Sequence, residues 1–211
     1  MITVLGIYAL IIAPLPDIKT IESKSLAEAS VIYDKNGGEL YRFWDEKRTY
    51  IPVAAISQPI KDAIVAIEDK TFYENKGIDF FGLARVSVNA IGNRLFGLHL
   101  ITGGASTISQ QLIKNMLLTP EKTLSRKIRE AWLSYELNQS YSKDQILELY
   151  LNKISFGHNA YGIEEASKTY FGKSAKDVGV FGASILASLP KGPTLYSPFS
   201  NRDRVIGYPF L

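Results

Sequence analysis

Residues 103–115 read GGASTISQQLIKN, and this stretch predicts a helix that begins after a glycine break. Ser106 or Thr107 opens the helix, and apolar residues recur on its inward face: Ile108, Leu112 and Met116. Gln110 and Lys114 are four residues apart, so the opposite face presents an amide and a cation together. Free backbone N–H groups at the start of the helix also favour an anion. The helix is therefore either a phosphate-binding element or a capped surface helix.

Helical spacing continues on both sides of this stretch. Upstream, Pro59 suits the first turn of a helix whose apolar face ends just before Glu68. Downstream, three further ranges are predicted to be helical: 124–139, 142–151 and 178–189. Between residues 31 and 43, two short β-type runs flank a glycine turn, which is typical of a β-hairpin. The sequence predicts a mostly α domain behind a short N-terminal β-hairpin.

Residues 80–100 are dense in apolar side chains and carry only Arg85 and Arg94 as charges. The apolar residues are too many for one stripe of a surface helix. This segment is predicted either to be deeply buried or to meet lipid.

The amino-terminal residues Met1 to Ala13 are uncharged, and Pro14 and Pro16 end the apolar run. A membrane-spanning helix needs about 20 apolar residues. We interpret residues 1–16 as the outer end of a membrane anchor whose start is absent from this chain, followed by a polar linker over 17–30. The alternative is a strand or helix that packs on the domain.

Bulk composition excludes several classes of protein. The 211 residues include 24 Lys plus Arg against 21 Asp plus Glu, a net charge of +3, which is too small for a dedicated nucleic-acid binder. The 46% share of hydrophobic residues is typical of a globular chain. Cysteine is absent, which excludes a disulfide scaffold, a thiolate nucleophile and a zinc–thiolate site.

Two glutamates have neighbours suited to chemistry. Glu68 ends an apolar run beside Asp69, and a carboxylate there can be partly desolvated, which suits it to proton transfer. Glu130 follows four cations that would suit a pyrophosphate: Lys122, Arg126, Lys127 and Arg129. The simpler alternatives are a surface acid pair at Glu68 and an ordinary i,i+4 ion pair between Arg126 and Glu130.

Other candidates have less support. His99 and His158 are isolated in the sequence, so neither a histidine metal site nor a Ser-His-Asp triad is indicated. Residues 140–143 read SYSK and match the Ser-x-x-Lys acylation pattern, but no Lys-Thr-Gly follows them.

Taken together, five segments resemble the peptidoglycan glycosyltransferase (transglycosylase) domain of class A penicillin-binding proteins, glycosyltransferase family 51. The resemblance covers about residues 31–199. The segments are EDKTF with GID (68–79), GASTISQQL with KN (104–115), RKIRE (126–130), ILELYLN with FG, GI and YFGK (146–173), and LP with YSP (189–198). One such segment would be weak evidence, whereas five in the family's order are specific.

The resemblance implies a lysozyme-like helical fold with a small membrane-abutting lobe at about residues 80–100. It implies lipid II and the growing glycan strand as substrates, membrane lipid as a contact, and a transpeptidase domain in cis or other cell-wall synthesis proteins as partners. The expected location is the cell membrane, with a single-pass anchor and the catalytic domain on the extracytoplasmic face. Family members often respond to magnesium or manganese, although the sequence predicts no dedicated metal cage.

The resemblance also implies roles for individual residues. Glu68 would be the general base, and Glu130 would hold the cations, or a divalent ion, that stabilise the departing pyrophosphate. The implied substrate-binding residues are Arg85, Ser106, Gln110, Gln111, Lys114, Lys122, Arg126 and Arg129.

This chain departs from the family pattern in two places. Asn75 stands where the first motif normally carries a histidine, and the tail at residues 201–211 does not resemble the family's usual continuation. The expected organisation is an anchor remnant over 1–16, a linker over 17–30, the glycosyltransferase domain over 31–200 and an atypical or truncated tail over 201–211. We favour the front part of a longer protein over a monofunctional version.

Two rival functions remain open from the sequence. A lysozyme-like hydrolase or lytic transglycosylase would share the fold and one catalytic glutamate, but would not need the cation cluster around Glu130. A non-catalytic, membrane-bound binding module would tolerate the loss of Glu68.

Overall fold

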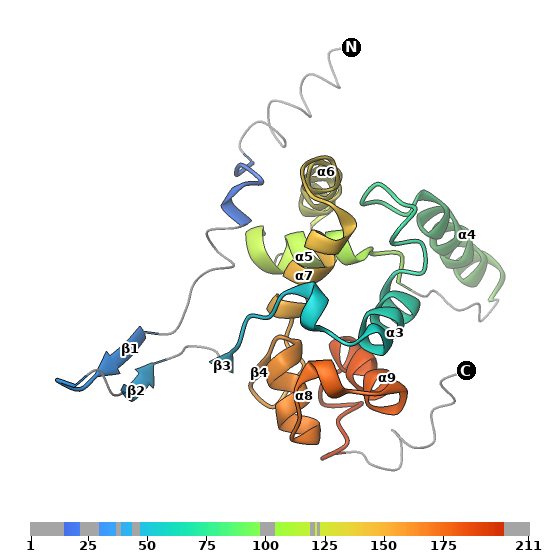
Figure 1. Cartoon of the computed structure of the whole chain (residues 1–211). Helices are drawn as coiled ribbons and strands as arrows, with labels where there is room; N and C mark the ends of the chain where they lie inside the picture. The colour runs from blue at the N-terminus through green and yellow to red at the C-terminus, as the bar shows by residue number, and fades with distance from the viewer. Residues whose placement is uncertain are drawn as a thin grey trace. The chain divides into compact units, whose positions relative to one another are not determined.

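The computed structural model describes residues 15–21, 30–36, 39–43, 47–97, 104–118, 121 and 123–200, and the fold is mostly helical (Figure 1). The chain divides into two compact units, one of residues 1–18 with 68–143 and the other of residues 19–67 with 144–211. This division runs inside the predicted domain 31–200, whose limits stay a prediction. The predicted anchor residues 1–14 and the tail 201–211 lie outside the described residues.

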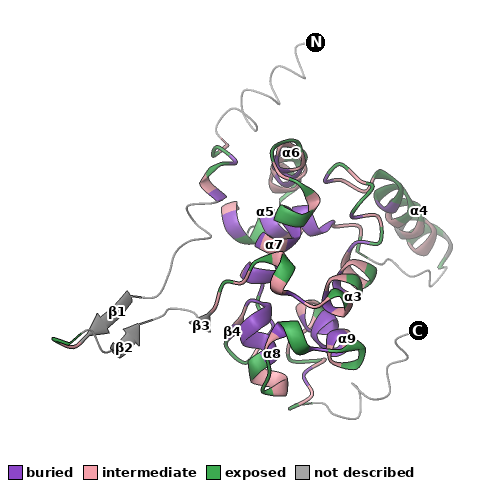
Figure 2. Cartoon of the chain, viewed as in Figure 1, coloured by how far each residue is buried: buried purple, intermediate pink, exposed green. Residues whose placement is uncertain are grey.

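The first unit contains α4 (Phe80–Phe96), α5 (Ile108–Leu117) and α6 (Leu124–Ser140). Helices α5 and α6 pack against each other. Their fully buried apolar side chains come from the faces that the helical spacing selects: Ile108, Leu112, Ile113, Leu133 and Leu137. Figure 2 shows this burial along the inner sides of the helices. The predicted helix pair is confirmed.

The structure selects Thr107 from the two candidate residues for the start of α5. Thr107 is the N-cap, and its hydroxyl accepts a hydrogen bond from the Gln110 N–H at 3.2 Å. The Gln110 side-chain oxygen in turn accepts from the Thr107 N–H at 3.1 Å, which completes a capping box. Gln110 is only 4% exposed, so the prediction that it shares a polar face with Lys114 is wrong.

Helix α4 is apolar and largely exposed. Asp79 caps its N-terminus by accepting from the Gly82 N–H, and Gly97 ends it in the left-handed conformation. Six large apolar side chains lie between 48% and 91% exposed: Phe80, Phe81, Leu83, Val88, Ile91 and Leu95. Of the two sequence-based alternatives for this segment, deep burial is therefore wrong.

The described part of the second unit contains short strands and several helices. Strands β1 (Ser30–Tyr33) and β2 (Glu39–Phe43) pair antiparallel, and β3 (Lys47–Arg48) pairs in parallel with β4 (Ala160–Tyr161). The helices are α3 (Gln58–Glu68), α7 (Lys143–Lys153), α8 (Ile163–Phe171) and α9 (Val180–Ser188), with 3-10 turns at Val53–Ala55, Ala175–Asp177 and Leu189–Lys191. The last residue of α3, Glu68, and the first residue of α7, Lys143, belong to the first unit. The division between the two units therefore falls at these two residues.

The core of the second unit includes Ile60 and Ile64 of α3, Tyr150 of α7, and Phe156 in the loop before β4. Helix α9 starts at Val180 rather than at Val178, and its first turn is not buried as predicted, because Val180 and Phe181 are 72% and 75% exposed. Most of the rest of α9 is buried, as its apolar composition predicts: Ala183, Ile185, Leu186, Ala187 and Ser188.

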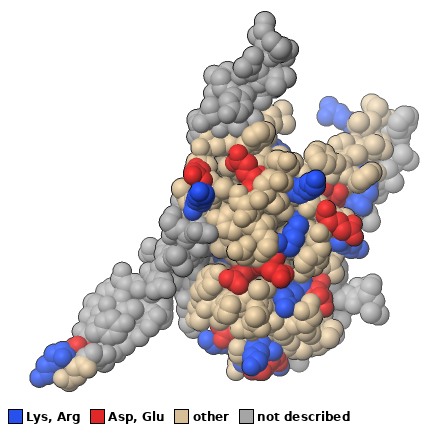
Figure 3. Space-filling view, turned by 45° about the horizontal axis from the view of Figure 1, so that its top comes forward, with Lys and Arg blue, Asp and Glu red and all other residues tan. Residues whose placement is uncertain are grey.

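Basic and acidic side chains are interspersed on the face shown in Figure 3, and neither sign forms a continuous patch there. This distribution agrees with the small net charge of +3. Among the described residues, no helix is both long and apolar enough to cross a bilayer.

Candidate active site

Glu68 is the last residue of α3, and only one of its two carboxylate oxygens is hydrogen-bonded to a described residue. Its Oε2 accepts a hydrogen bond from Gln111 Nε2 of α5 at 2.7 Å. Its Oε1 is buried and has no hydrogen-bond partner among the described residues. A buried carboxylate oxygen without a partner is costly to maintain, so it marks a place where a donor from a ligand would be stabilising.

Asp69 has a structural role beside Glu68. It is 6% exposed, and its Oδ2 accepts from the backbone N–H of Ile108, the first residue of α5, at 3.1 Å. A carboxylate at a helix N-terminus satisfies a free N–H and faces the positive end of the helix dipole. Asp69 thus fixes the start of α5 directly behind Glu68.

The loop from Asp69 to Gly77 is locked between α5 and α6. The Thr107 hydroxyl donates to the Gly77 carbonyl at 2.7 Å. Gly77 has φ +91°, and a Cβ there would lie 2.3 Å from the Ser134 carbonyl oxygen of α6. Only glycine fits this backbone and this space.

Asn75, which stands where the resemblance predicts a histidine, organises the same loop. Its Nδ2 donates to both carboxylate oxygens of Asp69, at 3.0 and 3.1 Å, and its Oδ1 accepts from the Gly77 N–H at 2.9 Å. The amide therefore closes the loop on itself with good geometry. The departure from the family pattern leaves this part of the site fully hydrogen-bonded.

Glu130 differs from Glu68 because both of its oxygens are paired. It is 1% exposed, its Oε2 accepts from Arg126 at 2.8 Å, and its Oε1 accepts from Lys127. The Lys127 ammonium also donates to Ser106 Oγ at 2.9 Å. Glu130 therefore orders two cations and, through Lys127, the segment that precedes α5.

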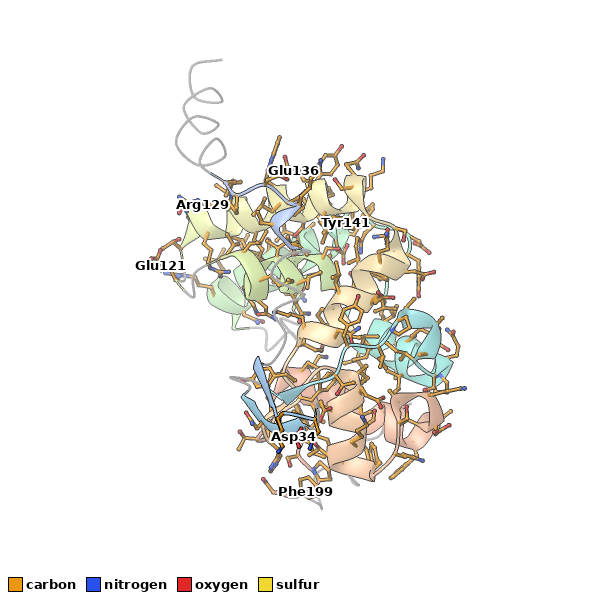
Figure 4. The ribbon with its side chains drawn as sticks, turned by 60° about the vertical axis from the view of Figure 1, so that its left-hand side comes forward. Asp34, Glu121, Arg129, Glu136, Tyr141 and Phe199 are labelled. Carbon is orange, nitrogen blue, oxygen red and sulfur yellow. The ribbon has the colours of Figure 1, made fainter. Side chains whose placement is uncertain are left out.

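Arg126 and Arg129 each have a side-chain nitrogen that makes no hydrogen bond with the described residues. The Nε atoms of Arg126 and Arg129 are buried and lack hydrogen-bond partners among the described residues. Arg126 and Arg129 as whole residues are partly exposed. Each arginine therefore has a buried Nε atom while part of its side chain remains accessible. Figure 4 shows Arg129 and Glu136 on α6 and Tyr141 just after its end, with Arg129 nearest the start of that helix.

The predicted site residues are brought together in part. Helix α5 contacts Glu68 directly through Gln111. Its connection to Glu130 is indirect, because Ser106, just before the helix, contacts the Lys127 that pairs with Glu130. Lys114 is exposed in the last turn of the same helix. Arg85 is exposed on α4, and Lys122 lies outside the described residues.

The sequence-based prediction does not include the contacts of several site residues. Lys127 is one: it is predicted as a cation for a pyrophosphate but pairs with Glu130, and its i,i+3 spacing to Glu130 is a usable signal. Asp69, Asn75, Asn138 and Lys143 are the others, and their contacts span up to 68 residues of sequence without any periodic signature.

The residues of the site do not form a cage for a divalent ion. In the part of the chain that the structure describes, no three acidic or histidine side chains converge. Both oxygens of Glu130 are already paired with cations. We therefore derive no step of the chemistry through a metal.

Comparison with known proteins identifies the family. The sequence model described as Transglycosylase matches residues 36–207. Penicillin-binding protein 1A of Rickettsia bellii (strain RML369-C) is 40% identical over 204 residues, which are 95% of this chain and 26% of that protein. Penicillin-binding protein 1A/1B of Bacillus subtilis (strain 168) is 41% identical over 198 residues, 93% of this chain and 21% of that protein.

A third relative, penicillin-binding protein 1A of Neisseria flavescens, is 39% identical over 190 residues, 90% of this chain and 23% of that protein. The chain thus spans about a quarter of the length of these curated relatives. Because the family model covers most of the residues, the chain belongs to the transglycosylase family, the peptidoglycan glycosyltransferase domain of class A penicillin-binding proteins.

Proposed function

We propose that this chain polymerises lipid II into the glycan strands of peptidoglycan, with inversion at the anomeric carbon and release of undecaprenyl pyrophosphate. The observation that carries the proposal is the contrast between the two glutamates. Glu68 keeps one buried oxygen that no described residue contacts by a hydrogen bond, whereas both oxygens of Glu130 are paired with cations. Family membership supplies the reaction class, and this contrast supplies the division of roles.

In the proposed reaction Glu68 is the general base. Its free oxygen takes the proton from the 4-hydroxyl of the acceptor N-acetylglucosamine while that oxygen attacks C1 of the donor N-acetylmuramic acid. The bond between C1 and the pyrophosphate oxygen breaks, and the leaving group departs with the electron pair. Gln111 keeps the carboxylate oriented through its 2.7 Å hydrogen bond.

The cations of the site stabilise the negative charge on the departing pyrophosphate. Arg126 and Arg129 have buried donors without partners, and Lys114 is exposed on the neighbouring helix α5. The other proposed substrate-binding residues are the cations Lys122 and Arg85 and the neutral Ser106. Glu130 is proposed as a positioning residue, since each of its carboxylate oxygens is already paired with a cation, Arg126 or Lys127.

Helix α4 is the proposed contact with the bilayer. Its exposed apolar side chains would cost free energy in water, about 25 cal/mol for each Å² left uncovered, and would be stabilised by acyl chains. We propose the cell membrane as the location, with a single-pass anchor preceding the domain and the site on the extracytoplasmic face. A transpeptidase domain in cis is proposed from the length of the relatives.

The experiment that tests the function offers the 211-residue chain two substrates, lipid II and finished peptidoglycan. The expected result is consumption of lipid II with stoichiometric release of undecaprenyl pyrophosphate and formation of glycan strands. Cleavage of finished peptidoglycan without use of lipid II would establish the hydrolase or lytic transglycosylase instead. Binding of lipid II without turnover would establish the non-catalytic module.

A further inference from the structure

Lys143, the first residue of α7, makes an unusual set of contacts for a lysine. Its Nζ donates to the Asn138 Oδ1 at 2.6 Å, to the Asn75 carbonyl at 2.7 Å and to the Asn75 Oδ1 at 3.3 Å. It also lies 4.7 Å from the centroid of the Phe72 ring. An ammonium has three donors, and these three contacts use all of them. Lys143 therefore has no donor left for a ligand, and it is not the base of an acylation site.

One branch of contacts runs from Lys143 to the residue beside Glu68. Lys143 holds Asn75, and Asn75 donates to both carboxylate oxygens of Asp69. Asp69 directly follows Glu68 in the chain and accepts from the first N–H of α5. A shift of the Lys143 ammonium is thus transmitted to the backbone that carries Glu68 through two hydrogen bonds.

The other branch runs from Lys143 to the residue that holds Glu68. Asn138 accepts from Lys143 and donates through its Nδ2 to Ser109 Oγ of α5 at 2.8 Å. Ser109 is fully buried and lies two residues before Gln111. Both partners of the Glu68–Gln111 hydrogen bond are therefore connected to one ammonium group.

The electrostatic setting of Lys143 agrees with this role. Burial lowers the pKa of the ammonium, and the nearby Asp69 carboxylate opposes part of that decrease. Ser109 and Asn138, which lie on the second branch, are neutral, so Asp69 is the charge that Lys143 meets in the network. The ammonium is held by hydrogen bonds and by the Phe72 ring rather than by a direct ion pair.

We propose that Lys143 is a positioning residue for the general base. It holds the loop 69–77 and the first turns of α5 in the arrangement that lets Gln111 hydrogen-bond to Glu68. The proposal rests on the function proposed above. It assigns to Lys143 an effect on the rate of glycosyl transfer rather than on the binding of lipid II, because misplacement of a catalytic group acts on the transition state.

The test measures kcat and KM for lipid II polymerisation in Lys143→Met and Lys143→Arg. A misplaced base is expected to lower kcat of Lys143→Met about 100-fold, with KM within about threefold of the wild type. Lys143→Arg keeps the charge and some of the donors, so its kcat is expected to lie between those of the wild type and of Lys143→Met. A wild-type kcat in Lys143→Met would overturn the proposal, and so would a raised KM with kcat unchanged, which would mark a binding residue.

Loss of stability alone is distinguished by a matched variant. Leu137→Ala removes a fully buried side chain next to Asn138 and is expected to lower the melting temperature while keeping kcat at temperatures where it is folded. If Leu137→Ala and Lys143→Met lost stability and kcat in parallel, the role of Lys143 would be structural only. Should Lys143→Met fail to fold, Asn138→Ala removes the Ser109 branch and the Asn138 hydrogen bond to the Ser134 carbonyl but leaves the Asn75 branch, and it is expected to lower kcat about 10-fold.

Glu68→Gln in the same assay separates this proposal from the one on which it rests. If the wild type does not polymerise lipid II, the proposed function fails. If the wild type is active, Glu68→Gln is inactive and Lys143→Met is fully active, only the positioning role fails.

Discussion

The side-chain amide of Gln111 donates to one oxygen of the Glu68 carboxylate at 2.7 Å and leaves the other oxygen without a partner among the described residues. Gln111 lies on α5, whose start is fixed by Asp69 and whose capping box is closed within the helix. The orientation of Glu68 is therefore set by a rigid element rather than by solvent. This arrangement leads to predictions for both glutamates and for the loop between them.

Removal of the Gln111 amide is predicted to impair the rate of polymerisation. Gln111→Leu leaves Glu68 without its orienting donor, so kcat is expected to fall about 10- to 100-fold while KM for lipid II stays near the wild-type value. Steady-state kinetics measure both constants. Gln139→Leu, at an exposed position of α6, is the matched control, and an equal loss in that variant would contradict the prediction.

Glu130→Gln is predicted to cost stability as well as activity. The neutral amide cannot balance Arg126 and Lys127, and removal of one partner of a fully buried ion pair costs about 3–5 kcal/mol. Since the Lys127 side chain is 42% exposed, we expect a smaller loss, about 2 kcal/mol, in denaturant unfolding. Glu136→Gln on the same helix should change stability by less than about 0.5 kcal/mol, and equal losses in the two variants would argue against a special role for Glu130.

Gly77→Ala is predicted to disrupt the loop behind Glu68. The new methyl group would lie 2.3 Å from the Ser134 carbonyl oxygen in a backbone with φ +91°, so both a clash and conformational strain result. Gly97→Ala isolates the strain, because Gly97 has φ +62° and open space around its Cβ position. Thermal unfolding should show a loss of about 1 kcal/mol for Gly97→Ala and a clearly larger one for Gly77→Ala. Similar losses would mean that the loop can move away from α6.

Acid is predicted to weaken the second unit through Glu164 of α8. Burial raises the pKa of Glu164, but hydrogen bonds from the Ala175 N–H, Lys168 and Ser174 outweigh it and lower the pKa below 4.5. A carboxyl whose pKa is lowered on folding stabilises the fold above pH 4.5 and loses that contribution as the pH falls through its folded-state pKa.

The difference in unfolding free energy between wild type and Glu164→Gln should therefore shrink as the pH falls from about 7 to about 3. Urea unfolding at a series of pH values measures this difference. Glu136→Gln is again the control, and the prediction is wrong if the Glu164→Gln difference does not depend on pH.

The helices were predictable from the sequence because their stability comes from apolar faces that repeat at helical spacing. Ile108, Leu112 and Met116 are buried as that spacing predicts. The start of α5 was less predictable, since Ser106 and Thr107 are both good caps and only the reciprocal contact with Gln110 selects Thr107. That same contact buries Gln110, which a simple two-faced helix would expose.

The candidate site was predictable only where residues are close in sequence. The Arg126–Glu130 ion pair follows from i,i+4 spacing. The contacts of Gln111 with Glu68 and of Lys143 with Asn75 join residues 43 and 68 positions apart, and they depend on how α5, α6 and the loop pack. Composition and periodicity carry no information about such pairs, so the resemblance names both Glu68 and Gln111 but not the contact between them.

The most direct measurement of the central claim is lipid II polymerisation by Glu68→Gln, made together with equilibrium binding of lipid II. Glutamine keeps the shape of the side chain but cannot accept a proton at neutral pH, and a general base acts mainly in the transition state. We predict that polymerisation falls at least about 100-fold while the dissociation constant for lipid II stays within about threefold. Polymerisation at the wild-type rate in Glu68→Gln would contradict the account.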